Sequence, residues 1–188
     1  MIYVALFLLS DMISREKESI TARALLSDFY KKIFGCAHPE IKKSELGKPY
    51  FDFPNSHPFS ISHSKGAVAV AVSDEACNIG IDVQKEVGKE KATRIFARFP
   101  FVKKRSFKEE PDIRIFKATL FDSTFLFEEL KPAPCRESDF TLLWTNTEAA
   151  LKSDGGGFAS AKKLDEIEKS CSIFSFKEGE FYISIAKT

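Results

Sequence analysis

The sequence predicts an α+β protein, because its helix-like and strand-like segments do not alternate regularly along the chain. Three observations support this prediction. An apolar, strand-like run opens the chain, and a long amphipathic segment follows it. Two strand-like runs follow one another near the middle, and the last residues have the pattern of a β-hairpin. A chain of 188 residues, 44% of them hydrophobic, is long enough to bury a core.

The beginning of the chain predicts a buried strand and then a helix. Residues 2–9 are apolar, but no basic region precedes them and the run is too short to cross a membrane. We therefore expect a strand here, not a signal peptide or a membrane anchor. Ser14 suits a helix N-cap and Gly35 a C-cap. Apolar residues recur between them at helical spacing, namely Ala22, Leu25, Leu26, Phe29 and Ile33.

The middle of the chain predicts a loop followed by strands and a helix. Residues 47–64 begin as a polar, proline-containing loop and end as a strand. Residues 67–72 and 78–84 are two further strands. A helix then follows, with apolar side chains on one side: Ala92, Ile95, Phe96 and Phe99.

The last part of the chain is predictable only in places. Residues 100–139 hold charge clusters and scattered phenylalanines and predict no defined element. Residues 140–152 form an amphipathic helix that ends before three glycines, and residues 159–170 fit a short helix or a loop. Residues 171–176 and 181–186 fit the two strands of a hairpin.

Charge and cysteine usage exclude some classes of protein. The chain has 28 Lys and Arg residues against 27 Asp and Glu, a net charge of +1, which argues against a general nucleic-acid binder but leaves room for a local basic patch. Its four cysteines form no C-x-x-C pair, and with only three histidines a zinc site is not expected. Reduced thiols are the simplest interpretation, and they indicate a cytoplasmic protein.

The strand at 78–84 carries the first group of chemically suitable side chains. Successive side chains of a strand point to opposite faces, so Asp82 and Gln84 share one face, roughly 6.5 Å apart. Mg²⁺ prefers one or two carboxylates together with water and substrate phosphates, so this pair suits a magnesium site. Taken alone, this segment is better explained by a solvent-facing acid at the end of a strand.

Two other segments carry suitable groups. Glu148 and Lys152 are four residues apart and therefore neighbours on one face of the predicted helix. They fit a surface ion pair worth ~0.3–0.5 kcal/mol. They also fit a functional pair, in which Glu148 is a second carboxylate for the cation and Lys152 binds a phosphate. Gly47-Lys48-Pro49 predicts a rigid turn that presents one cation. Further along, alternate residues of a strand are serines, with His63 on the opposite face. These groups suit phosphate, yet each also fits an ordinary loop or strand. The serines are Ser60, Ser62 and Ser64.

In their order the motifs strongly resemble the 4′-phosphopantetheinyl transferase superfamily. The chain reads G-K-P, F-S-I-S-H-S, G-I-D-V-Q and W-T-N-T-E-A-A-L-K. The superfamily pattern is approximately G-K-P, F-N-I-S-H-S, G-I-D-V-E and W-x-x-K-E-A-x-x-K, at similar intervals. The resemblance covers the middle and the last third of the chain.

The resemblance implies a metal site and a catalytic group. It assigns Mg²⁺ to Asp82 and Glu148, with Gln84 as a third ligand. Glu148 would accept the proton of the attacking hydroxyl, and Lys152 would stabilise the leaving group at the pyrophosphate.

The resemblance also implies contacts to coenzyme A, the co-substrate. Lys48, Ser62 and His63 would hold its phosphates together with Lys152, and His63 would contact the ribose phosphate. Ser64 and Arg23 would be accessory contacts.

Three residues depart from the superfamily pattern. Gln84 stands where an acid is common and removes one negative charge from the metal site. Thr147 stands where a lysine is usual and removes a cation from the pyrophosphate region. Ser60 stands where asparagine is common. These changes bear on catalytic strength more than on fold or ligand class.

The fold and function that the resemblance implies are specific. The fold has two pseudo-symmetric halves, 1–83 and 84–188, each a small antiparallel sheet packed on a long helix, with coenzyme A between them. The enzyme, a holo-carrier-protein synthase, transfers 4′-phosphopantetheine to a serine of an apo acyl or peptidyl carrier protein, as a cytoplasmic monomer. The alternative is a weakened paralogue that binds coenzyme A or a carrier without transfer.

Overall fold

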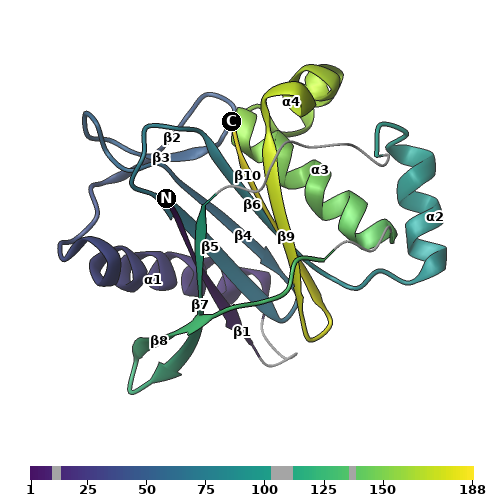
Figure 1. Ribbon diagram of the computed structural model, residues 1–188. Helices are drawn as coiled ribbons and strands as arrows, with labels where there is room; N and C mark the ends of the chain where they lie inside the picture. Colours follow the sequence, from purple (N-terminus) through teal and green to yellow (C-terminus); the bar gives the residue numbers. More distant parts are fainter. Residues whose placement is uncertain (10–13, 103–111, 136–138) are drawn as a thin grey trace.

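The protein is built from two β-sheets packed face to face, with a long helix on the outer side of each (Figure 1). The computed structural model describes residues 1–9, 14–102, 112–135 and 139–188. Mixed helices and segregated, largely antiparallel sheets confirm the predicted α+β class.

The larger sheet has five strands in the order β4-β5-β1-β7-β8. They are β1 (Ile2–Leu8), β4 (Phe59–Ser64), β5 (Ala67–Ser73), β7 (Ile113–Phe121) and β8 (Thr124–Leu130). Neighbouring strands are antiparallel except β1 and β7, which run parallel. The first strand of the chain is therefore the central strand of this sheet.

Helix α1 (Arg15–Phe34) covers the outer face of the five-stranded sheet. The predicted caps are confirmed, since Ser14 accepts a hydrogen bond from the Lys17 amide and Gly35 ends the helix with a φ of 73°. That left-handed conformation suits glycine. The core beneath α1 is apolar and includes Ala22, Leu25, Leu26, Phe29, Val68 and Val70.

The smaller sheet has three antiparallel strands in the order β6-β10-β9. They are β6 (Ile79–Lys85), β10 (Phe181–Lys187) and β9 (Ser172–Glu178). Its inner face packs against the larger sheet through branched apolar residues such as Ile79, Ile81, Val83, Ile183 and Ile185. The alternation predicted for residues 78–84 is thus confirmed.

Helix α3 (Phe140–Asp154) lies on the outer face of the smaller sheet at a short distance. Small residues face it from β6, β10 and β9: Gly80, Ala186, Ser184 and Ser175. A Cβ added to Gly80 would lie 2.1 Å from the Ala149 carbonyl oxygen and 2.5 Å from the Ser153 nitrogen. The glycine therefore sets how closely the helix approaches the strand.

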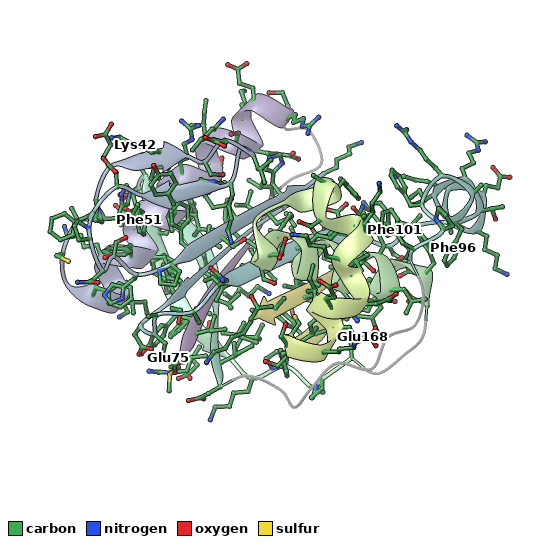
Figure 2. All side chains as sticks on the ribbon, turned by 90° about the horizontal axis from the view of Figure 1, so that it is seen from above. Lys42, Phe51, Glu75, Phe96, Phe101 and Glu168 are labelled. Carbon is green, nitrogen blue, oxygen red and sulfur yellow. The ribbon has the colours of Figure 1, made fainter. Side chains whose placement is uncertain are left out.

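Shorter elements complete the fold. Strands β2 (Ile41–Lys43) and β3 (Pro49–Phe51) form a small separate hairpin, and η1 (Gly157–Lys163) with α4 (Leu164–Ser170) follows α3. Helix α2 (Lys89–Arg98) lies at the opposite end of α3, where Figure 2 labels Phe96 and Phe101. Aromatic rings fill the space between α2, α3 and η1, in a cluster of Phe96, Phe99, Phe101, Phe140, Trp144 and Phe158.

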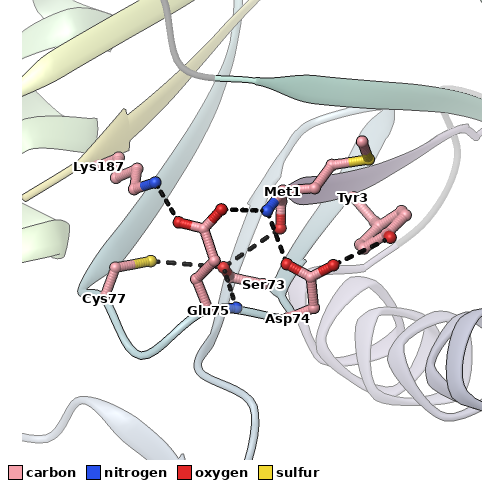
Figure 3. Close-up of polar contacts among 7 residues, drawn as sticks. All are labelled: Met1, Tyr3, Ser73, Asp74, Glu75, Cys77 and Lys187. Carbon is pink, nitrogen blue, oxygen red and sulfur yellow. Dashed lines mark hydrogen bonds and ion pairs between the residues drawn. The ribbon is translucent and has the colours of Figure 1, made fainter.

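A polar cluster joins the two sheets at one end (Figure 3). The Met1 amino group donates to Asp74 at 2.6 Å and to Glu75 at 2.5 Å, and Lys187 of β10 donates to the other oxygen of Glu75. These hydrogen bonds, first with Lys187 and then with the amino group, lower the pKa of Glu75 to about 2. Glu75 thus links the larger sheet to the smaller one.

Part of the prediction for residues 100–139 is corrected by the structure. Strands β7 and β8 form a regular hairpin where the sequence indicated no element, whereas residues 103–111 and 136–138 lie outside the described residues. The pseudo-symmetric layout and the boundary at 83/84 stay predictions. No helix of the described ranges is both long and apolar enough to cross a membrane.

Candidate functional site

Asp82 is the buried centre of the candidate site. β6 points its side chain toward α3, and only 4% of the residue is exposed. Its Oδ1 accepts hydrogen bonds from Ser62 Oγ at 2.9 Å and from Lys152 Nζ at 2.6 Å. Its Oδ2 is buried and has no hydrogen-bond partner among the described residues. A buried carboxylate oxygen in this state is costly unless a cation or a proton meets it.

Glu148 and Lys152 come from the C-terminal half of α3, one turn apart. Lys152 Nζ lies 3.9 Å from Glu148 Oε2, so its shorter contact to Asp82 dominates. Burial and then the negative charge of Asp82 raise the pKa of Glu148 to about 7, while the charge of Lys152 opposes the shift. A hydrogen bond between the two carboxyl groups adds to the rise, so the proton of Glu148 is shared with Asp82 when no cation is bound. Two carboxyl groups thus share one ammonium group, and the one on α3 holds its proton near neutrality.

Three serines of β4 join it to β6 and fix the strand that carries Asp82. Ser60 Oγ accepts from the Ile81 amide at 3.1 Å, Ser62 Oγ from Val83 at 3.2 Å, and Ser64 Oγ from Lys85 at 3.4 Å. β10 pairs with one edge of β6. Along the other edge, alternate backbone amides of β6 donate hydrogen bonds to the serine hydroxyls. We call this set of contacts the serine ladder.

The residues present fit a single divalent cation. No group of three or more His, Cys, Asp or Glu side chains arranged for a metal occurs in the described part of the chain. Mg²⁺ nevertheless needs only one or two carboxylates when water and phosphate complete its shell. The unpartnered Oδ2 of Asp82 beside the carboxyl group of Glu148 meets that requirement.

Gln84 is less clearly placed for this metal. It lies on the Asp82 face of β6, but its amide nitrogen contacts Ser64 Oγ at 3.5 Å and the Lys85 carbonyl at 3.3 Å. The side chain is therefore held at the end of β6 by its own neighbours.

Two cavities adjoin the candidate site. One of 220 Å³ lies between the turn at Gly47, strand β4 and the end of α3, and Lys152 lines it. A second of 680 Å³ extends from it toward Asn78 and His57. Residues of the 46–49 turn, Phe59 and Gly155 line both. Their combined size is that of a pocket for an organic cofactor.

Lys48 lies at the border of these two cavities and also caps α3. Its Nζ donates to the carbonyls of Ser153 at 3.1 Å and Ile79 at 3.3 Å. Burial lowers the pKa of this lysine, although Asp154 partly opposes the shift. The cation thus stabilises the negative end of the α3 dipole while it lines both cavities.

His63 lies on the other face of β4, away from Asp82. Its Nδ1 lies 3.2 Å from Glu18 Oε2, a carboxylate that α1 buries. Arg15 and Lys65 line a 400 Å³ hollow with this pair, and Arg23 is exposed on α1. The structure therefore brings Asp82, Glu148, Lys152 and Ser62 together, and places Lys48 and His63 on separate sides of them.

One comparison with known proteins bears on this geometry. No family model matches the chain. The chain is 26% identical over 165 residues to the protein named 4′-phosphopantetheinyl transferase gsp of Aneurinibacillus migulanus. The match covers 79% of this chain and 59% of that protein, so the chain spans less than two thirds of its relative.

The chain is related to the 4′-phosphopantetheinyl transferases. The resemblance predicted from the four motifs is thereby confirmed at the level of the superfamily. The roles of the individual residues stay predictions.

Thr147 departs from the superfamily pattern, and its surroundings explain what the threonine does here. It is 1% exposed, and its Oγ1 donates to the Leu143 carbonyl at 2.8 Å within α3. A lysine at this position would have to leave the helix interface before its ammonium group could reach a phosphate.

Sequence reasoning missed two groups of polar residues near the site. Asn146 Oδ1 accepts from Ser175 Oγ at 2.6 Å and Ser184 Oγ at 2.7 Å, and Ser184 is the cross-strand neighbour of Asp82. A lone serine in the apolar run 181–186 was a usable signal for this network. Glu18 gave no such signal, because only the packing of α1 on β4 brings it to His63.

Proposed function

We propose that the chain transfers the 4′-phosphopantetheine group of coenzyme A to a serine of an apo carrier protein, in a reaction that depends on Mg²⁺. The observation that carries this proposal is the meeting of Asp82, Glu148 and Lys152 beside two joined cavities. Two carboxyl groups and one ammonium group at one point suit a pyrophosphate and its metal. The kinship with phosphopantetheinyl transferases makes this the favoured chemistry.

The cavities suit coenzyme A. Lys152 lines the smaller cavity and is the group that would meet the pyrophosphate, and Lys48 lines both. His63, with Arg15 and Lys65 around it, would receive the ribose phosphate at the other side of β4. Ser64, beside His63 and Gln84, would be an accessory contact.

Each residue would do a definite part of the transfer. The carrier serine oxygen bonds to the phosphorus on the pantetheine side, and the bond from that phosphorus to the adenosine 3′,5′-bisphosphate breaks. Glu148 would accept the serine proton, directly or through a water on the metal, as the resemblance implies. Lys152 stabilises the charge that develops on the departing bisphosphate.

Asp82 and Glu148 would hold the metal, with Gln84 at the edge of its shell. Mg²⁺ in such a site supplies positive charge that orients and neutralises the phosphates. Hydrogen bonds from Ser62 and Lys152 hold one carboxylate oxygen of Asp82 in place, which would limit how far this ligand could move during the reaction.

A second candidate function is binding of coenzyme A or a carrier protein without transfer. Two observations favour it: Gln84 is held by Ser64 and Lys85, and Thr147 is buried at the position where the superfamily pattern has a lysine. The holo-carrier-protein synthase type, the monomeric state and a cytoplasmic location belong to the transferase proposal.

Mass spectrometry of apo carrier proteins decides between the two functions. The transferase proposal expects one added phosphopantetheine mass that requires both coenzyme A and Mg²⁺. Glu148→Gln should abolish the gain, whereas Glu166→Gln, an exposed glutamate on α4, should not. If a broad panel of acyl and peptidyl carriers stays unmodified while coenzyme A binds, the transfer function is wrong and the binding function stands.

A further inference from the structure

Ser62 contacts more of the site than any other serine of the ladder. It is 5% exposed and lies within hydrogen-bond distance of three groups. The Val83 amide donates to its Oγ at 3.2 Å, Lys152 Nζ donates at 3.0 Å, and the hydroxyl donates to Asp82 Oδ1 at 2.9 Å. Lys152 Nζ also reaches the same Asp82 oxygen at 2.6 Å, which closes a triangle.

The hydrogen-bonding capacity of Ser62 is fully used by these contacts. A serine hydroxyl has one proton to donate and two lone pairs to accept with. The proton goes to Asp82, and the lone pairs receive the Val83 amide and Lys152. To bind a phosphate oxygen, Ser62 would have to withdraw its proton from Asp82, leaving a buried carboxylate with one partner fewer.

We propose that Ser62 is a positioning residue, which fixes Asp82 and Lys152 relative to each other, and not a ligand of a coenzyme A phosphate. By holding Oδ1 together with Lys152, it leaves Oδ2 as the oxygen of Asp82 with no protein partner among the described residues. The hydroxyl therefore selects which carboxylate oxygen faces the cation. This inference deepens the proposed function and rests on it only for the metal.

The serine ladder supplies a matched control. Ser60 is equally buried, at 5% exposed, and accepts from the Ile81 amide at 3.1 Å, the same backbone contact that Ser62 makes two residues later. Among the described residues it makes no hydrogen bond to Asp82 or Lys152. Ser60→Ala and Ser62→Ala each leave one backbone amide of β6 without its acceptor. Only Ser62→Ala also breaks the triangle.

The first arm of the test needs no ligand. Melting temperatures are measured for Ser62→Ala and Ser60→Ala, each alone and combined with Lys152→Met. Ser62 and Lys152 both bind Asp82, so their contributions to the melting temperature should not be additive. The sum of the decreases in the two single variants should exceed the decrease in the double variant by roughly 2–4 °C. Ser60 and Lys152 should be additive. Additivity for both pairs overturns the proposal.

The second arm follows metal and nucleotide binding in the single variants. For each variant we take the Mg²⁺ concentration that gives half of the metal-induced rise in melting temperature. This concentration should be roughly threefold to tenfold higher for Ser62→Ala than for Ser60→Ala. Ser62→Thr keeps the hydroxyl and should therefore need the same Mg²⁺ concentration as the unmutated protein. The ratio of affinities for coenzyme A and 3′-dephospho-coenzyme A should not change.

Two results of the second arm contradict the positioning role. An equal metal requirement in the two alanine variants would show that Ser62 does not act on Asp82. A selective loss of coenzyme A affinity would make Ser62 a phosphate ligand. If Mg²⁺ does not stabilise the unmutated protein, the metal part of the proposed function fails instead, and the coupling of Ser62 to Lys152 alone decides the inference.

Discussion

Replacing Gly80 by alanine tests the close approach of β6 to α3, on which the position of Glu148 and Lys152 depends. The added Cβ would lie 2.1 Å from the Ala149 oxygen and 2.5 Å from the Ser153 nitrogen. Both are backbone atoms of a helix, so no side chain can rotate away. Overpacking typically costs about 1–3 kcal/mol, and we expect Gly80→Ala at the upper end, about 3 kcal/mol. For a chain of this size the melting temperature should fall by roughly 6–12 °C.

The assay compares thermal unfolding of Gly80→Ala with that of Gly88→Ala. Gly88 is the N-cap of α2, has a φ of −63°, and has no atom within 4 Å of an added Cβ. Its replacement removes a favourable cap residue only, at a cost below about 1 kcal/mol. If the two variants melt within a degree or two of each other, α3 does not rest on Gly80 and the reasoning is refuted. The proposed transferase activity should also fall with Gly80→Ala, even below its melting temperature, because α3 carries Glu148 and Lys152.

Three further predictions follow from charge. Because the pKa of Glu148 is raised on folding from about 4.5 to about 7, the ligand-free protein should lose about 2–3 kcal/mol of stability as pH rises through this range. Denaturant unfolding between pH 5 and 8 should show this loss in the unmutated protein but not in Glu148→Gln. His63→Ala should weaken the binding of coenzyme A much more than that of 3′-dephospho-coenzyme A, with a difference of roughly tenfold to a hundredfold in affinity measured by titration. Equal losses of affinity for the two ligands would place His63 away from the ribose phosphate. Gln84→Glu should lower the Mg²⁺ needed for half-maximal activity, since a carboxylate adds attraction to the dication; an unchanged requirement would mean that residue 84 does not face the metal.

Most of the fold was predictable where the periodicity was clear, and one hairpin was not. β1, α1 and β6 carry simple apolar patterns with recognisable caps or alternation. The β7–β8 hairpin turns at Asp122 and Ser123, which both have positive φ, 45° and 64°. A two-residue turn of this kind usually has Asn-Gly or Asp-Gly, so Asp-Ser gave no signal. Exposed Leu120, Phe121 and Leu126 also blurred the alternation of the two strands.

In the candidate site, sequence order indicated which residues meet but not which way each side chain points. Asp82 and Glu148 lie near each other because β6 and α3 pack together, and their common role at a metal stays a prediction. The partners of Lys48 and His63 are set by contacts between distant segments: backbone carbonyls at the end of α3 for Lys48, and Glu18 of α1 for His63. Neither partner belongs to a motif, so neither could be read from spacing.

The central place of β1 in the larger sheet has a consequence for how the chain folds during synthesis. β5 pairs with one side of β1 soon after it is made, but the other side waits for β7, and β6 waits for β10 near the end of the sequence. Until then both strands expose edges that attract other chains. Pairings between such distant segments make folding slow. We therefore expect chains truncated before β10 to aggregate on expression, and refolding from denaturant to be slower than for a helical protein of equal length.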